Sequence, residues 1–319
     1  MEKRILHRYV TKKYIFSYML AMFLLFLLSE PTVAAEGARF GLMLWANRLL
    51  PSLLPFMILT QILIRSGYLD AVTKKMRITY PYFVLFAGTL FGFPMGCKLT
   101  TDLYERGNLT SDEASLLFII SNQMSPAFVG GYILSETLHT PQLIPATYLI
   151  LYLPSVCYGL LRLYSLSVKR KHSGKNTVRE AKKSTSGLQM NVTVLDAGIM
   201  NSFETMLKLG GYVMLFSIIA NMCRYFFSAF PAFCTLVAGL LEVTGAVSAV
   251  NDFFSDAHLK YTAILAATAF GGCSGIAQTA SLIRSNKRAS SLSIAAYIRG
   301  RLIVAGVTAL LALLCYPFL

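Results

Sequence analysis

The chain carries little charge for its length. Only 14% of its 319 residues are charged, and Asp and Glu together number 15. A typical soluble domain has about 25% charged residues, whereas this chain is 55% hydrophobic and has a mean hydropathy of +0.58. The composition therefore excludes an ordinary water-soluble protein and predicts a polytopic membrane protein.

Residues and motifs that support catalysis are also scarce. The four His lie in the termini or in predicted loops, and the six Cys lie in apolar runs without a CxxC pair. This pattern predicts packing thiols and favours neither a metal cluster nor a disulfide framework. No GxxxxGK(S/T), GxGxxG, HExxH or GxSxG motif occurs in a supporting context. We therefore expect neither an enzyme nor a bound cofactor.

Basic residues, in contrast, are abundant at the ends of the apolar runs. The net charge is +14, but the Lys and Arg residues do not gather on one soluble face, so we expect no nucleic-acid partner. In a membrane protein such clusters mark the cytoplasmic side. The clusters are residues 3–13, 65–77, 169–183 and 284–288, whereas residues 135–140 and 251–259 lack Lys and Arg. This charge rule predicts a cytoplasmic N-terminus and a C-terminus outside.

Nine apolar runs are present, and a helix that spans the bilayer needs about 20 residues. Seven runs are predicted to span: residues 14–28, 40–64, 114–134, 143–168, 199–227, 261–283 and 292–319. Runs 82–93 and 233–250 cannot also cross if the basic clusters are to lie inside. Each is therefore predicted to enter the membrane and turn back, the first from the cytoplasm and the second from outside.

Two stretches repeat the same order of interrupted runs, residues 81–168 and residues 231–318. An offset of 149 positions lays Gly96 on Gly245 and Ser125 on Ser274. An alternative offset of 179 matches Gly92 with Gly271, but it would pair a hairpin with a broken helix. We predict an all-α fold with an inverted repeat, two re-entrant hairpins, two broken helices and about seven spanning helices.

The repeat divides the chain into four parts. Residues 1–36 are predicted to form a signal-anchor helix, with a cleaved signal peptide as the alternative. Residues 37–168 form the first repeat and residues 198–319 the second. Residues 169–197 between them are polar and basic, which predicts a flexible cytoplasmic linker, with binding to anionic lipid head groups as the alternative.

The interruptions predict the position of a substrate site. Backbone that is not helical at membrane depth survives only inside protein or beside a water-filled cavity. A new helix begins after each interruption, and its first amide groups favour anions. The predicted substrate-binding residues are Gly92, Phe93, Pro94, Met95, Gly96, Lys98, Asn122, Gln123, Ser125, Thr244, Gly245, Gly271, Gly272, Ser274 and Gln278.

Two charged residues lie beside the hairpin turns. Lys98 follows the first turn, where it either faces the site or reaches back to the cytoplasmic surface. Glu242 lies at the second turn and is the predicted coupling residue, through a proton, sodium or a pairing with Lys98. The alternative for Glu242 is a structural carboxylate that caps the following helix near Thr244 and Gly245.

With these segments in place, the chain resembles the nucleoside-recognition (Gate) domain membrane proteins, and most closely the sporulation integral membrane proteins of the YlbJ type. The resemblance rests on residues 47–56, 92–96, 122–128, 239–245 and 270–272. It implies a relationship to concentrative nucleoside transporters and a role in endospore formation. The implied activity is transport of dipicolinic acid across the outer forespore membrane.

The resulting hypothesis is a secondary transporter in a bacterial membrane whose substrate is a small organic anion. A nucleoside or nucleobase substrate is the alternative, although the first turn holds Phe-Pro-Met where nucleoside transporters have a Gln-Thr-Glu type of motif. A second alternative is a non-transporting membrane scaffold for sporulation that docks partners on the basic linker. The expected partners are the solute and the lipid bilayer, and by analogy further copies of the chain.

Overall fold

The computed structural model describes residues 2–76, 78–172, 191–284 and 288–318. Every regular element within these ranges is a helix, because helices satisfy their own backbone groups where no water is available. The predicted all-α polytopic membrane protein is thereby confirmed. Residues 173–190, which hold most of the predicted linker, and Lys287 of the last basic cluster lie outside the described residues.

By length and composition, four helices can cross a membrane: Pro141–Lys169, Val192–Phe226, Ala257–Arg284 and Ile294–Phe318. A fifth candidate consists of Ser17–Ser29 and Pro31–Leu49, which are bent by 104° at the break between them. The shorter helices of the other predicted spans do not meet this criterion alone. The count of seven spans and the boundaries of the four parts therefore stay predictions.

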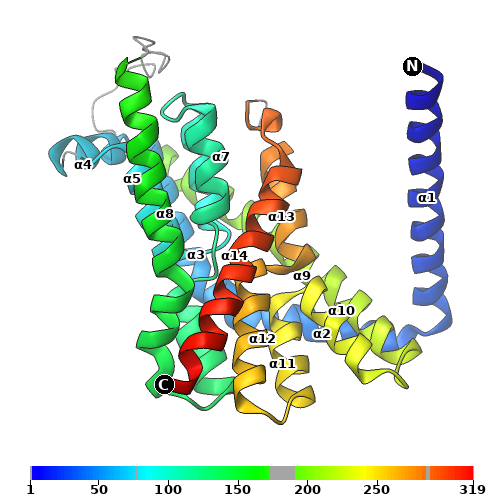
Figure 1. Ribbon diagram of the computed structural model, residues 1–319. Helices are drawn as coiled ribbons and strands as arrows, with labels where there is room; N and C mark the ends of the chain where they lie inside the picture. The colour runs from blue at the N-terminus through cyan, green and yellow to red at the C-terminus, as the bar shows by residue number, and fades with distance from the viewer. Residues whose placement is uncertain (1, 77, 173–190, 285–287, 319) are drawn as a thin grey trace.

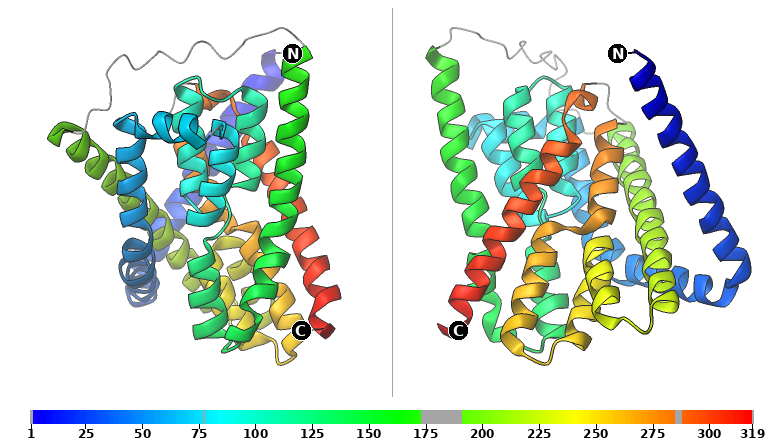
Figure 2. Two further views of the ribbon diagram at one scale, coloured as in Figure 1. Left: turned by 90° about the vertical axis from the view of Figure 1, so that its left-hand side faces the viewer. Right: turned by 45° about the vertical axis from the view of Figure 1, so that its right-hand side comes forward.

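The first helix, α1 (Glu2–Ser29), stands apart from the helical body (Figures 1 and 2). It is followed by α2 (Pro31–Leu44), which runs across the body rather than along it. Pro31 opens α2 and has no amide hydrogen to continue the ladder of α1. A short π-helix, η1 (Trp45–Leu49), joins α2 to α3 (Leu50–Arg65).

The segment from α2 to α3 packs along α9 (Val192–Phe226), and we call these elements the scaffold pair. Small residues let the two backbones approach, as in other membrane helix pairs. A Cβ atom at Gly41 would lie 2.7 Å from Met214 Cα, and one at Gly210 would lie 2.8 Å from the Trp45 ring. Trp45 Nε1 also donates to the Met206 carbonyl at 2.9 Å.

The remaining helices follow one order twice. In the first half the hairpin consists of α5 (Tyr80–Phe91) and α6 (Met95–Glu105), the broken helix of α7 (Ser111–Ile120) and η2 (Phe128–Thr137), and the last helix is α8 (Ile144–His172). In the second half these are α10 (Pro231–Leu241) and α11 (Val243–Phe253), α12 (Ala257–Phe270) and α13 (Gly272–Arg284), and α14 (Ile294–Cys315). The short elements are α4 (Tyr68–Met76), η3 (Pro141–Leu143), η4 (Ala289–Ser291) and η5 (Tyr316–Phe318).

The two hairpins enter from opposite ends of the molecule. The α10–α11 hairpin lies at the end that holds the C-terminus, and the α5–α6 hairpin lies at the end where α8 finishes (Figures 1 and 2). Hairpin therefore corresponds to hairpin and broken helix to broken helix, which is the correspondence of the 149 offset. The residue-level register and the sides of the membrane stay predictions.

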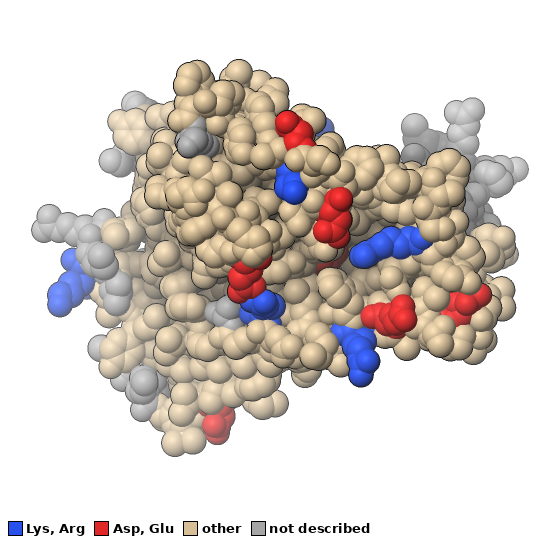
Figure 3. Space-filling model, turned by 90° about the horizontal axis from the view of Figure 1, so that it is seen from below, with Lys and Arg blue, Asp and Glu red and all other residues tan. Residues whose placement is uncertain are grey.

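The face at the C-terminal end carries few charges. Figure 3 shows Lys and Arg side chains mixed with Asp and Glu over this face, with no basic cluster among the residues described. The charge rule expects this of an outer face. Around the body, large apolar side chains of the long helices are exposed, as a lipid environment requires. Examples are Leu149, Leu161, Leu207, Ile303 and Leu310.

Candidate functional site

The tip of the first hairpin is a tight turn between α5 and α6. Gly92 has φ +72°, which is the left-handed region, and a Cβ atom there would overlap the backbone of Ser125. A Cβ atom at Gly96 would overlap the carbonyl oxygen of Ser121. The Phe93–Pro94 peptide bond between them is cis. The tip therefore packs directly on the interruption between α7 and η2.

That interruption holds the tip through hydrogen bonds. The Phe93 amide donates to the Gln123 carbonyl at 2.5 Å, and the Cys97 amide donates to Asn122 Oδ1 at 3.2 Å. Asn122 Nδ2 in turn donates to Thr279 and Tyr297 of the second half, at 3.1 Å each. The Asn122 side chain therefore accepts one of the free backbone amides in the first turn of α6. The sequence predicts that these amides contact a substrate anion.

The tip of the second hairpin is the single residue Glu242, in an extended conformation between α10 and α11. Its carboxylate accepts the Gly245 amide at 2.8 Å and the Thr244 hydroxyl at 2.6 Å. This is an N-cap of α11, the geometry of the structural alternative for Glu242. The side chain is only 9% exposed and lines the cavity described below.

The second interruption, between α12 and α13, repeats the contact between tip and broken helix. Gly271 and Gly272 both have positive φ, +87° and +69°. A Cβ atom at Gly272 would lie 3.0 Å from the Leu241 carbonyl oxygen and 3.2 Å from Glu242 Cα. Each hairpin tip is therefore packed on the interruption of the broken helix in its own half.

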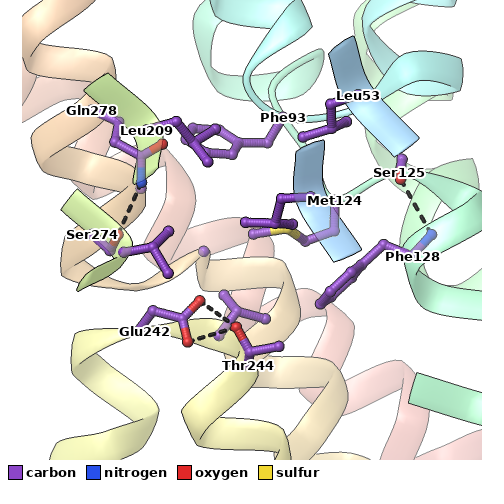
Figure 4. Close-up of a pocket in the computed structure, with 15 residues that line it drawn as sticks. Leu53, Phe93, Met124, Ser125, Phe128, Leu209, Glu242, Thr244, Ser274 and Gln278 are labelled. Carbon is purple, nitrogen blue, oxygen red and sulfur yellow. Dashed lines mark hydrogen bonds between the residues drawn. The ribbon is translucent and has the colours of Figure 1, made fainter. Parts of the chain in front are cut away.

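A cavity lies where the two tips, the two interruptions and the scaffold pair meet (Figure 4). The space between its atoms amounts to about 570 Å³, its open mouth included. Its lining residues are Leu49, Leu53, Phe93, Met124, Ser125, Phe128, Leu209, Val213, Glu242, Val243, Thr244, Gly271, Ser274, Gly275 and Gln278. A concave, mostly apolar site with a few converging polar groups is the usual form of a small-molecule site.

All of the predicted site residues except Pro94 and Lys98 fall into two groups. Those that line the cavity are Phe93, Ser125, Glu242, Thr244, Gly271, Ser274 and Gln278. Those that support it from behind are Gly92, Met95, Gly96, Asn122, Gln123, Gly245 and Gly272. Pro94 lies beside it, in a smaller hollow of about 260 Å³ that shares Leu209 and Gln278 with the cavity. The contact of any of these residues with a substrate stays a prediction.

Lys98 does not line the cavity. Its Nζ pairs with Asp102 Oδ1 at 3.1 Å, and Asp102 Oδ2 accepts from Gln61 Nε2 of α3 at 2.9 Å. The side chains of Lys98 and Asp102 are 14% and 19% exposed. Since Glu242 bonds to its own helix, the pairing of Lys98 with Glu242 that the sequence allowed is not formed in this conformation.

Gln278 carries the most informative polar atom of the cavity. Its side chain is 6% exposed, and Nε2 donates to Ser274 Oγ at 2.9 Å, but Oε1 has no partner. Because the Ser274 hydroxyl can donate or accept, either orientation of the amide leaves one polar atom unpaired. A buried polar atom without a partner costs about 1–3 kcal/mol. Such an atom at the wall of a cavity indicates a place for a ligand or a water molecule.

Several residues of the site were not predicted from the sequence. The lining side chains of the scaffold pair, such as Leu53 and Leu209, look like any other apolar residue of a long run. Asp102, the partner of Lys98, was also missed. The spacing of four residues between Lys98 and Asp102 favours an ion pair on one helix face, and so it could have indicated the pairing.

Comparison with known proteins agrees with the resemblance. The chain is 29% identical over 229 residues to the sporulation integral membrane protein YlbJ of Bacillus subtilis (strain 168). The match covers 63% of this chain and 55% of that protein, so the chain spans about half the length of this relative. This similarity supports a sporulation membrane protein of the YlbJ type. The relationship to Gate-domain proteins and nucleoside transporters stays a prediction.

No family model matches the chain, and no solved structure matches it significantly. The integral membrane location is supported both by the relative's name and by the apolar helices. The geometry of the cavity is therefore the main guide to what the protein does there.

Proposed function

We propose that the chain is a secondary transporter and that the cavity holds its substrate during transport. The observation that carries this proposal is the convergence of both hairpin tips and both helix interruptions on one cavity beside the scaffold pair. Interrupted helices in corresponding halves form the substrate sites of many transporters. Movement of the tips and broken helices against the scaffold pair would expose the site to each side in turn.

Within this proposal the substrate is a small organic anion, and dipicolinic acid is the specific candidate. This finer assignment is implied by the resemblance to the YlbJ type and by three features of the lining. Ser125 Oγ accepts from the Phe128 amide at 3.2 Å, and Ser274 Oγ accepts from Gln278, so each hydroxyl hydrogen is available to a carboxylate. Phe93 and Phe128 offer faces on which an aromatic ring can stack.

Charge balance then gives Glu242 its role. No Lys or Arg is among the lining residues of the cavity in the described chain, and Lys208 of the adjoining hollow is paired with Glu204. A dicarboxylate in the cavity would therefore meet the Glu242 carboxylate with no unpaired cation beside it. Placing like charges together in a poorly hydrated site is costly unless a cation or proton accompanies them. We propose that Glu242 couples transport in this way, through sodium or a proton that enters with the substrate.

The absence of a basic lining residue also favours a second candidate, a neutral nucleoside or nucleobase. The unpaired Gln278 atom and the Phe rings suit a base as well as they suit a pyridine ring. The two substrates differ in charge, so one assay separates them. The scaffold hypothesis rests on the linker, most of which lies outside the described residues.

The test is uptake of labelled dipicolinate into liposomes that contain the purified protein, with empty liposomes as the blank. We expect saturable uptake that rises with an applied sodium or proton gradient, and a rate that falls by about tenfold or more in Ser274→Ala, since a hydrogen bond to a charged group is worth about 1.5–3 kcal/mol. Ser165→Ala is the matched control, because Ser165 is exposed on α8 and bonds only to the Leu161 carbonyl.

The same assay decides between the candidates. Competition by uridine or adenosine, with no dipicolinate uptake of its own, would favour the nucleoside transporter. A folded protein that moves neither class of solute in either direction would overturn the transport proposal and favour the scaffold. For the location, we propose a cytoplasmic N-terminus and the outer forespore membrane, which fluorescent fusions in sporulating cells would test.

A further inference from the structure

Arg301 is a fully buried arginine in the middle of the helical body. It lies on α14 and is only 1% exposed. Its Nε donates to the Phe270 carbonyl and its Nη1 to the Ile119 carbonyl, each at 3.3 Å. No carboxylate pairs with it among the described residues. A buried charge without a counter-ion is costly, so these two carbonyls are the feature that explains it.

The two carbonyls belong to the ends of two different helices. Phe270 is the last residue of α12, and Ile119 is in the last turn of α7. The final carbonyls of a helix have no partner within it and carry about half a negative charge together. One guanidinium thus meets the negative ends of two helices, one from each half of the chain, and compensates both.

Each of these helix ends leads directly into a hairpin contact. Beyond α7, Ser121 lies against Gly96, and Gln123 accepts the Phe93 amide. Beyond α12, Gly272 lies against Glu242. Arg301 therefore joins two units, each formed by one hairpin tip and one interruption, in addition to the bonds that Asn122 makes to Thr279 and Tyr297.

The local sequence of α14 brings it to this junction. A Cβ atom at Gly300 would lie 2.6 Å from the Ile119 side chain, so a glycine there lets α14 approach α7. One turn earlier, Tyr297 Oη accepts from Asn122 Nδ2. In the first half, α8 instead uses the neutral hydroxyls of Tyr148 and Tyr152, which donate to the carbonyls of Pro126 and Met124 of the same half.

We propose that Arg301 is a positioning residue that clamps the two interruptions together, so that both hairpin tips move as one body against the scaffold pair. The proposal goes beyond substrate transport, because it concerns the joint between the halves and does not depend on what the cavity binds. A purely local role for Arg301 would affect the α12 end and the second tip alone.

Two native thiols can report on the two units separately. Cys97 is buried just beyond the first tip, and Cys273 follows Gly272 at the second interruption. Cys97 reacts with a membrane-permeant maleimide only when its unit opens, whereas Cys273 is partly exposed and reacts faster when its unit opens, so the change in each labelling rate relative to wild type reports on one unit. The experiment uses the full-length chain with the other four Cys replaced by Ala: Cys157, Cys223, Cys234 and Cys315.

We expect Arg301→Met to raise the labelling rates of Cys97 and Cys273 together, each by about tenfold, the scale of losing one charge-assisted hydrogen bond. Arg301→Lys should raise both by a smaller factor, because an ammonium can reach carbonyls but lacks the fork of the guanidinium. Arg299→Met is the matched control, since Arg299 is exposed on the same helix, and it should leave both rates unchanged.

A rise at Cys273 alone, or at neither thiol, would overturn the clamp. If Arg301→Met does not fold, as judged by its elution and thermal unfolding, the comparison of Arg301→Lys with wild type decides by the same criterion. Where transport is measurable, Arg301→Lys should lower the maximal rate and leave the half-saturating concentration unchanged, because every cavity side chain is kept. The thiol result stands without this measurement, so failure of the transport proposal would be seen separately.

Discussion

Glu242 accepts a hydrogen bond from the backbone amide of Gly245 at 2.8 Å, and thereby caps α11 from inside the cavity. One carboxylate therefore serves the fold and faces the proposed substrate. The helix end that would otherwise attract an anion already has an anion of its own. The two roles can be separated by changing charge and shape independently.

Replacing Glu242 by Gln removes the charge but keeps an oxygen that can accept the Gly245 amide. We expect thermal unfolding close to wild type and transport that no longer responds to a sodium or proton gradient. Glu242→Ala should also lose the cap, which costs about 0.5–2 kcal/mol. Asp256→Asn is the control, since Asp256 caps α12 at an exposed position through the Leu259 amide. Gradient-dependent transport by Glu242→Gln would contradict the coupling role.

The glycines of the first tip should be intolerant of any side chain. Gly92→Ala must adopt φ +72° and overlap Ser125, and Gly96→Ala must overlap the Ser121 carbonyl. We expect each to lower the stability by more than about 1 kcal/mol, because the colliding atoms are backbone, and to abolish transport. Gly239→Ala is the control in the limb of the second hairpin, where nothing lies within 4 Å of the added atom. It should be neutral or stabilising by up to about 1 kcal/mol.

Gln278 should behave unlike an ordinary buried polar residue. Gln278→Met removes an atom that has no partner in the substrate-free protein, so we expect an unfolding temperature equal to or above that of wild type. Substrate affinity should fall by about tenfold, measured by the thermal shift that a ligand panel produces. Gln61→Met gives the contrast, because Gln61 bonds to Asp102, and it should destabilise by about 1–3 kcal/mol. Unchanged affinity in Gln278→Met would place the substrate elsewhere.

Lys98 and Asp102 should be coupled to each other rather than to the substrate. Lys98→Met alone leaves a largely buried carboxylate without its ammonium partner, which is strongly destabilising. We expect Lys98→Met with Asp102→Asn to recover most of the lost stability and also the transport rate. A double variant that is stable but does not transport would indicate that Lys98 contacts the substrate. The measurement is a double-mutant cycle of thermal unfolding, together with dipicolinate uptake.

Part of the fold and of the cavity could be predicted from the sequence. Gly92, Pro94 and Gly271 interrupt apolar runs, and such residues favour a turn or a break in a helix, so the hairpins and the broken helices could be located. The cap by Glu242 was one of two interpretations, because a carboxylate three residues before Gly245 suits the N-terminus of a helix. In contrast, Leu209 lines the cavity through packing between distant helices, and no local pattern distinguishes it from a lipid-facing leucine.

The partners of Arg301 could not be predicted from the sequence, for a different reason. Its charge inside an apolar run is visible in the sequence, but its two partners are main-chain carbonyls at positions 119 and 270. Carbonyls carry no signature of residue type, so only the three-dimensional arrangement reveals the bond. The direction of α2 across the body also could not be predicted from the sequence, because it depends on packing along the distant helix α9.

The inverted arrangement that we predict for the two halves leads to a last test. The segment between η2 and η3 lies at the end of the molecule that holds the C-terminus, whereas α13 finishes at the other end (Figure 1). In a chain without native Cys, His139→Cys and Arg284→Cys place single thiols on exposed residues of these two segments. The charge rule predicts that the end with the C-terminus lies outside. We therefore expect a membrane-impermeant maleimide to label position 139 from outside intact cells and position 284 only in inverted vesicles. Labelling of both from one side would mean that the halves are not inverted, and the cavity could then not be reached alternately from the two sides by the movement proposed here.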